Sequence, residues 1–74
     1  MFNFQKILLK VNFNNPTQNF ELMRKVDELL GVYSVATDRE TGVLTIMGCI
    51  DHVTLLTHAM KFDKTARIIS GDDL

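Results

Sequence analysis

Residues 5–31 read QKILLKVNFNNPTQNFELMRKVDELLG, and this stretch decides the fold because it predicts a strand followed by a helix. In its first part apolar and polar residues alternate, so that Ile7, Leu9 and Val11 fall on one face. This period of two residues is typical of a half-buried strand, which we predict over 5–13. Leu8 breaks the alternation by falling on the face of the lysines.

The second part of the stretch carries the signals of a capped helix. Asn15 is a suitable N-cap, Pro16 suits the first helical position, and Gln18 follows as in a capping box. Gly31 supplies the left-handed residue that often ends a helix. Apolar residues recur between them at helical spacing, at Phe20, Met23, Val26, Leu29 and Leu30.

Further along the chain, two β-rich segments flank a turn. They cover 32–38 and 43–47, and the turn at 39–42 ends in glycine. This pattern predicts a hairpin.

A second helix and a last strand complete the pattern. Asp51 is a good N-cap for a helix that reaches about Lys61. A last strand is expected over 66–70, followed by a loose tail at 71–74. The apolar residues of this helix are Val53, Leu56, Ala59 and Met60.

The resulting order β-α-β-β-α-β predicts the α+β, ferredoxin-like arrangement. Right-handed crossovers place both helices on one face of a four-stranded antiparallel sheet with strand order 4-1-3-2. The 74 residues are enough for one small domain, so we expect a single domain over 1–74 with its core at about 5–70.

Composition narrows the class of protein. The chain is 46% hydrophobic and 23% charged, which is typical of a globular protein. Its net charge is −1 with no block of either sign, which argues against nucleic acid or an anionic membrane as a partner held by charge. Cys49 is the one cysteine and has no disulfide partner within the chain, which favours a reducing, cytoplasmic location.

Three short stretches carry a family resemblance. They are Lys10-Val11 before the loop, LGVYSV at 30–35 and GCID at 48–51. Over about 6–70 the chain resembles the heavy-metal-associated domain of copper chaperones, metal-pumping ATPases and plant metallochaperone-like proteins. The plant branch is the most similar, and the resemblance implies the same ferredoxin-like fold.

The resemblance also locates the metal site of this family. That site is a Met-x-Cys-x-x-Cys loop after the first strand, in which two thiolates hold a soft ion such as Cu(I) or Zn(II). The methionine position corresponds to Phe13, and the two cysteine positions correspond to Asn15 and Gln18. Because amide oxygens are weak donors for a soft ion, we expect no metal at these positions and no cofactor.

Other ligand or catalytic patterns are weak. Cys49, His52 and His58 are the remaining soft ligands, and a six-residue step places the two histidines on different faces of a helix. Asp51 is explained as a cap, and no glycine-rich phosphate loop occurs. We therefore expect no enzyme. The other carboxylates are expected to be solvated charges, namely Asp27, Glu28, Asp38, Glu40 and Asp63.

The sheet face away from the helices is the candidate site for a protein partner. If Ile7 and Leu9 point toward the helices, Lys6, Leu8 and Lys10 point outward. The family's strand phase places Val43, Thr45 and Met47 outward beside them. Scattered apolar surface residues are normal, but a contiguous exposed patch marks a protein-binding face. The expected partner-binding residues are Lys6, Leu8, Lys10, Val43, Met47, Arg67 and Ile69.

The sequence thus favours a non-enzymatic interaction module that binds a protein through the open sheet face or through an edge strand. Among the plant proteins that it resembles, inserts in intracellular immune receptors act as bait for pathogen effectors. The alternative function is metal-ion binding as a metallochaperone, the default of the family. A third reading is self-association into a homodimer.

Overall fold

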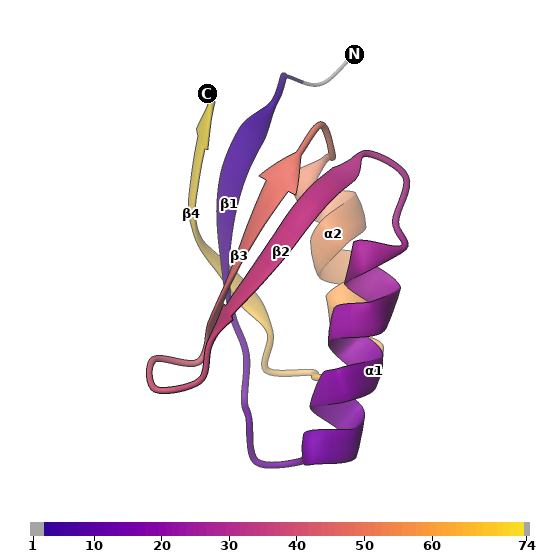
Figure 1. Cartoon of the computed structure of the whole chain (residues 1–74), viewed down its shortest axis with the longest axis vertical. Helices are drawn as coiled ribbons and strands as arrows, with labels where there is room; N and C mark the ends of the chain where they lie inside the picture. Colours follow the sequence, from indigo (N-terminus) through magenta and orange to yellow (C-terminus); the bar gives the residue numbers. More distant parts are fainter. Residues whose placement is uncertain (1–2, 74) are drawn as a thin grey trace.

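The computed structural model describes residues 3–73 and orders its elements as β-α-β-β-α-β (Figure 1). The strands form one antiparallel sheet with the order β2-β3-β1-β4. This arrangement confirms the predicted ferredoxin-like α+β fold. The strands are β1 (Gln5–Lys10), β2 (Val32–Asp38), β3 (Val43–Gly48) and β4 (Arg67–Asp73), and the helices are α1 (Pro16–Asp27) and α2 (His52–Ala59).

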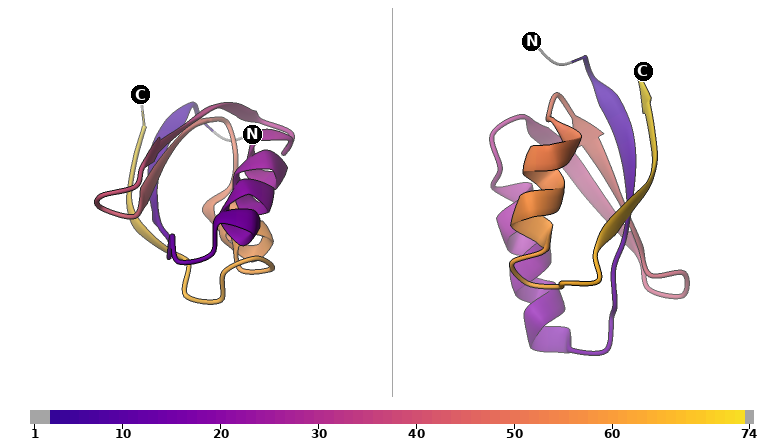
Figure 2. Two further views of the ribbon diagram at one scale, coloured as in Figure 1. Left: turned by 60° about the horizontal axis from the view of Figure 1, so that its bottom comes forward. Right: turned by 180° about the vertical axis from the view of Figure 1, so that it is seen from behind.

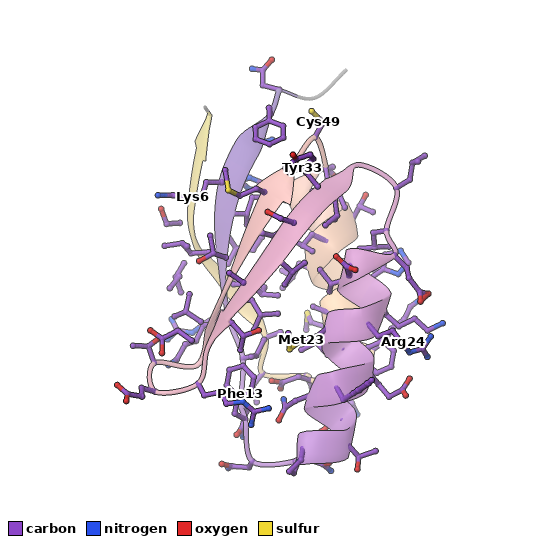
Figure 3. All side chains as sticks on the ribbon, in the orientation of Figure 1. Lys6, Phe13, Met23, Arg24, Tyr33 and Cys49 are labelled. Carbon is purple, nitrogen blue, oxygen red and sulfur yellow. The ribbon has the colours of Figure 1, made fainter. Side chains whose placement is uncertain are left out.

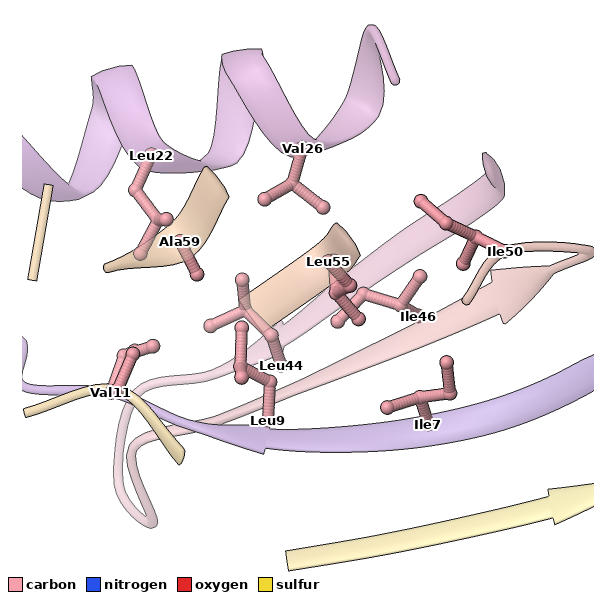
Figure 4. Close-up of a cluster of buried hydrophobic side chains, with 11 residues drawn as sticks. Ile7, Leu9, Val11, Leu22, Val26, Leu44, Ile46, Ile50, Leu55 and Ala59 are labelled. Atoms are coloured by element: carbon pink, nitrogen blue, oxygen red, sulfur yellow. The ribbon is translucent and has the colours of Figure 1, made fainter. Parts of the chain in front are cut away.

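Both helices cover the same face of the sheet, and the opposite face is left open (Figures 1 and 2). The core lies between these layers, where β1 and β3 meet the helices (Figure 4). Ile7 and Leu9 are fully buried, as the alternation in β1 predicts. The other large side chains that are fully buried are Leu22, Val26, Leu44, Ile46 and Leu55.

The two predicted N-caps are confirmed. The side chain of Asn15 accepts a hydrogen bond of 3.0 Å from the backbone N–H of Gln18, with Pro16 in the first turn. The side chain of Asp51 accepts one of 3.3 Å from the backbone N–H of Thr54. Each cap satisfies an N–H group that has no partner inside its helix.

Helix α1 differs from the prediction at its end and in its buried face. It ends at Asp27 because the next turn tightens, with the N–H of Leu29 donating to the carbonyl of Val26. The side chain of Leu30 is 98% exposed, and that of Phe20 is 57% exposed. The buried face instead consists of Asn19, Leu22 and Val26.

Helix α2 is also shorter than predicted, because it ends at Ala59. Its core-facing residues are Leu55 and Ala59. Val53 and Met60, which the helical spacing assigned to the core, are 69% and 41% exposed. The eight-residue helix therefore presents a narrower apolar face than its sequence indicates.

The first and last strands of the chain also differ from their predicted bounds. Strand β1 ends at Lys10, since beyond it the N–H of Val11 donates to the carbonyl of Gly42 in the hairpin turn. Strand β4 continues to Asp73, so that residues 71–73 pair with β1, Gln5 lying opposite Asp73. The prediction of a loose tail was wrong for these three residues, because backbone pairing needs no apolar side chain. Leu74 lies outside the described residues.

Two of the stretches that carry the resemblance meet at Gly31 and Gly48. Gly31 has a φ of +99°, and its carbonyl accepts a 2.8 Å hydrogen bond from the N–H of Cys49. A Cβ atom on Gly48 would collide with the carbonyl oxygen of Gly31 and lie 2.9 Å from the Cα of Val32. The close approach of the α1–β2 connection to the end of β3 therefore requires glycine.

Candidate functional site

The open face of β1 and β3 carries five of the predicted partner-binding residues. In the register of the two strands, Lys6 lies opposite Met47 and Lys10 lies opposite Val43, while Leu8 lies opposite Thr45 between them. These side chains are half-buried and alternate with the fully buried Ile7 and Leu9. Figure 3 shows Lys6 on this part of the sheet.

Strand β4 does not place every second residue on this face, because its pairing with β1 shifts register. Arg67 is exposed and lies opposite Lys10. Ile69, 44% exposed, falls where the register shifts, so that Ser70 lies opposite Leu8. Such a β-bulge leaves one residue without a partner in the ladder. The structure therefore brings Arg67 to Lys10, whereas Ile69 sits at the irregularity.

Strand β2, which pairs with the other edge of β3, places small and polar residues opposite the open-face residues of β3. Ser34 lies opposite Met47, Ala36 opposite Thr45, and Asp38 opposite Val43. None of these three residues is bulky, and they lie beside the half-buried Val43 and Met47 of β3. We call the open sheet face the surface formed by Lys6, Leu8, Lys10, Val43, Met47 and Arg67.

The loop between β1 and α1 holds the three positions that correspond to the family's metal motif. Phe13 is half-buried, and the guanidinium carbon of Arg39 lies 5.8 Å from the centre of its ring. The side-chain oxygen of Asn15 is used as the helix cap, and Gln18 is exposed. The donors at these positions are two amides and an aromatic ring, a set that does not fit a soft metal ion.

Cys49 lies at the opposite end of the sheet from this loop. Figure 3 shows Cys49 beside Tyr33 at one end and Phe13 at the other. The thiol of Cys49 is free and exposed. His52 is half-buried, with its Nε2 atom 2.7 Å from Oε1 of Gln5. Within residues 3–73, no three histidine, cysteine or acidic side chains gather closely enough to hold a metal ion.

Asp63 was predicted to be a solvated charge, and this prediction was wrong. Only 8% of it is exposed, and its carboxylate accepts hydrogen bonds from the N–H of Asn12 (2.7 Å) and from the N–H and hydroxyl of Thr65 (2.9 and 2.5 Å). Burial acts to raise the pKa of Asp63, but the hydrogen bonds from Thr65 and Asn12 outweigh it and hold the pKa below its ordinary value.

Asn19 continues this polar cluster beneath the loop. Its side-chain N–H group donates a 2.8 Å hydrogen bond to the carbonyl of Asn12, and the residue is only 3% exposed. Its side-chain oxygen has no hydrogen-bond partner within the described part of the chain. Asp63 and Asn19 thus hold Asn12 from two sides, which fixes the start of the loop. Sequence reasoning missed both residues, because no local motif links them to Asn12.

The described residues contain no helix with the length and apolar character that crossing a lipid bilayer requires.

Comparison with known proteins finds a similar segment in a plant protein. The chain is 34% identical over 67 residues to heavy metal-associated isoprenylated plant protein 34 of Arabidopsis thaliana. The match covers 90% of this chain but only 12% of the length of that protein. No family model matches the chain.

Proposed function

We propose that this chain is a heavy-metal-associated-type domain, since it is similar along nine-tenths of its length to one segment of a plant heavy metal-associated protein. In this proposal the chain has lost the family's metal site and acts as a non-enzymatic protein-binding module. The partner contacts the open sheet face. The resemblance implies pathogen effectors as one partner class, through the immune-receptor inserts that carry such domains.

The observation that carries this proposal is the use made of Asn15. Where the family places the first metal-binding cysteine, the chain has an amide whose oxygen accepts a 3.0 Å hydrogen bond from the N–H of Gln18. The second cysteine position is Gln18 itself, which supplies that N–H. The side-chain oxygen of Asn15 is therefore used by the helix cap and not by a ligand. The exposed Cys49 lies at the opposite end of the sheet, so it does not replace the missing thiolates.

A competition experiment with a Cu(I) chelator tests the loss of the metal site. We expect the chain not to withdraw Cu(I) from the chelator, whereas the double variant Asn15→Cys, Gln18→Cys withdraws one ion per chain. The double variant is the positive control, since it restores two thiolates at the family's spacing. Uptake of one ion per unaltered chain would instead support the metallochaperone alternative.

The exposure and charge of the open sheet face support the second part of the proposal. Two lysines and Arg67 surround half-exposed apolar side chains on the central strands. Among residues 3–70, the ion pairs involve Arg24 with Glu21 and Glu28 on α1, so that Lys10 and Arg67 of this face pair with no carboxylate of that range. Apolar contact area with charges around it is typical of a protein-binding surface.

Substitution of Met47 tests this face. We expect Met47→Glu to weaken the binding of candidate partners at least tenfold in a titration, because a carboxylate would have to be desolvated at the interface. Val53→Glu is the matched control, since Val53 is 69% exposed on α2, on the other side of the molecule. Equal affinities for both variants would remove the open sheet face from the proposal. Sedimentation at several concentrations shows whether a second copy of the chain is the partner.

A further inference from the structure

A shallow groove of about 440 Å³ lies at the end of the sheet where β1 stops. Three segments far apart in the sequence line it: the end of β1 with the loop after it (residues 10–14), the β2–β3 turn (39–42), and Thr65 and Arg67 before and at the start of β4. Phe13, at the lower end of the sheet in Figure 3, marks its position. We call this feature the basic groove.

Three cations line the basic groove: Lys10, Arg39 and Arg67. Glu40 is the one acidic residue in its lining within the described chain, and none of the three cations forms an ion pair there. The nearby Asp38 is engaged in the turn, because its Oδ1 accepts hydrogen bonds from the N–H groups of Glu40 and Thr41. Three of the eight basic residues of a chain with net charge −1 thus gather at one groove.

The placement of Lys10 and Arg67 is unfavourable for an empty groove. They are direct partners in the antiparallel register of β1 and β4. Like charges directly opposite each other on neighbouring strands destabilise a sheet, and a bound anion would offset that repulsion. The strand pairing therefore places two positive charges side by side, and neither forms an ion pair with a carboxylate of residues 3–70.

Two of the cations are held in place. The Nζ atom of Lys10 donates to the carbonyl oxygen of Thr41, and Arg39 lies over the ring of Phe13 at 5.8 Å. A ligand that meets such side chains loses less conformational freedom in them on binding. Lys10 and Arg67 come from the sheet and Arg39 from the turn, so the donors approach the groove from different segments.

We propose that the basic groove binds a tetrahedral oxyanion, namely inorganic phosphate or the phosphate group of a monoester. Arginine and lysine recognise phosphate through charge-assisted hydrogen bonds. A phosphate dianion offers several oxygens in different directions to the three donors, whereas a single carboxylate offers two oxygens in one plane. The basic groove shares Lys10 and Arg67 with the open sheet face, whereas Arg39 is outside that face. Phosphate binding can therefore be tested on the chain alone, without a protein partner.

Titration with inorganic phosphate at constant ionic strength tests the proposal, with backbone amide chemical shifts as the signal. We expect saturable shifts confined to residues 10–14, 39–42 and 65–67. The double variant Arg39→Gln, Arg67→Gln should bind phosphate at least tenfold more weakly. The matched control is Lys25→Gln, Lys61→Gln, which removes the same charge from a different groove between the helices and should change the affinity less than twofold.

Two results of the phosphate titration would overturn the proposal. One is a set of shifts that does not saturate and equals the effect of chloride. The other is equal weakening by the control variant, which would reveal an effect of net charge alone. If the double variant does not fold, the single variants Arg39→Gln and Arg67→Gln and the map of shifts in the unaltered chain decide the question.

Two further arms identify the source of the phosphate. Sedimentation with phosphatidic acid vesicles that is stronger than with phosphatidylcholine vesicles, and that the double variant loses, indicates a lipid headgroup and supports the oxyanion chemistry. Saturation by free phosphate with no vesicle binding indicates a small phosphorylated ligand and supports it equally. Binding of a polyglutamate peptide that phosphate does not displace would overturn it in favour of a surface that reads carboxylates.

Discussion

The carboxylate of Asp63 accepts a 2.7 Å hydrogen bond from the backbone N–H of Asn12, a residue 51 positions earlier in the chain. This bond joins the connection between α2 and β4 to the loop that follows β1. The loop carries the positions that correspond to the metal motif of the family resemblance, and Asn12 also lines the basic groove. The geometry of this end of the domain therefore depends on a buried acid in another segment.

Removal of that acid should weaken the fold. Asp63→Ala leaves three donors without their acceptor, namely the N–H of Asn12 and the N–H and hydroxyl of Thr65. We expect a loss of about 2 kcal/mol in the free energy of unfolding, measured with urea. Asp27→Ala is the matched control, because Asp27 is exposed on α1 and should stay within about 0.5 kcal/mol of the unaltered chain. Equal stability of the two variants would contradict the role assigned to Asp63.

The same group makes stability depend on pH in a defined direction. Because the pKa of Asp63 in the folded chain lies below its ordinary value of 3.8, the unfolded state takes up its proton first as the solution is acidified. The contribution of Asp63 is therefore complete above that value and is lost as the pH falls through the folded pKa. We expect the stability difference between the unaltered chain and Asp63→Asn to shrink as the pH is lowered below the ordinary value of 3.8. A difference that stays constant on acidification would show that the carboxylate is not responsible.

Loss of the cap at α1 should cost less than loss of Asp63. Asn15→Ala removes the acceptor for the N–H of Gln18, and such substitutions cost about 1 kcal/mol. Asn15→Asp is the matched control, since it keeps an acceptor beside the positive end of the helix dipole. Thermal unfolding of both variants checks the prediction. A stable alanine variant would indicate that Asn15 is free to act as a ligand, which would weaken the proposed function.

The close contact between Gly31 and Gly48 predicts that one added methyl group strongly lowers the stability of the fold. Gly48→Ala places a Cβ against the carbonyl of Gly31 and 2.9 Å from the Cα of Val32. Backbone atoms cannot move aside as a side chain can, so we expect a loss of about 3 kcal/mol in urea unfolding. Ser34→Ala, at a half-buried position of β2, should change stability much less and serves as the comparison. A Gly48→Ala variant as stable as Ser34→Ala would show that the two segments are not in close contact.

The fold was predictable because its signals are local. The alternation of Ile7 and Leu9 assigns one face of β1 to the core, and Asn15 and Asp51 mark where the helices begin. The order of elements then leaves few topologies. The helix faces were harder to predict, since Phe20 is the more apolar residue but Asn19 and Leu22 are the buried ones. A buried asparagine becomes intelligible only once its partner Asn12 lies beside it.

The candidate sites could be predicted only in part. The family resemblance implied the positions that correspond to the metal motif, and the alternation of β1 turns Lys6 and Lys10 outward. The basic groove does not, because Arg39 and Arg67 reach it from segments that are joined only in the folded chain. The position of Ile69 was also hidden, since nothing in its neighbours signals the bulge in β4.

The pairing of Gln5 with Asp73 has an architectural consequence. Partners across an antiparallel ladder lie only about 5 Å apart, so the polypeptide enters and leaves this unit almost at one point. Such a unit can therefore be inserted into a surface loop of another protein without forcing the two ends of that loop apart. For the same reason, a circular permutant that joins these ends and opens the turn at 39–42 should retain the topology.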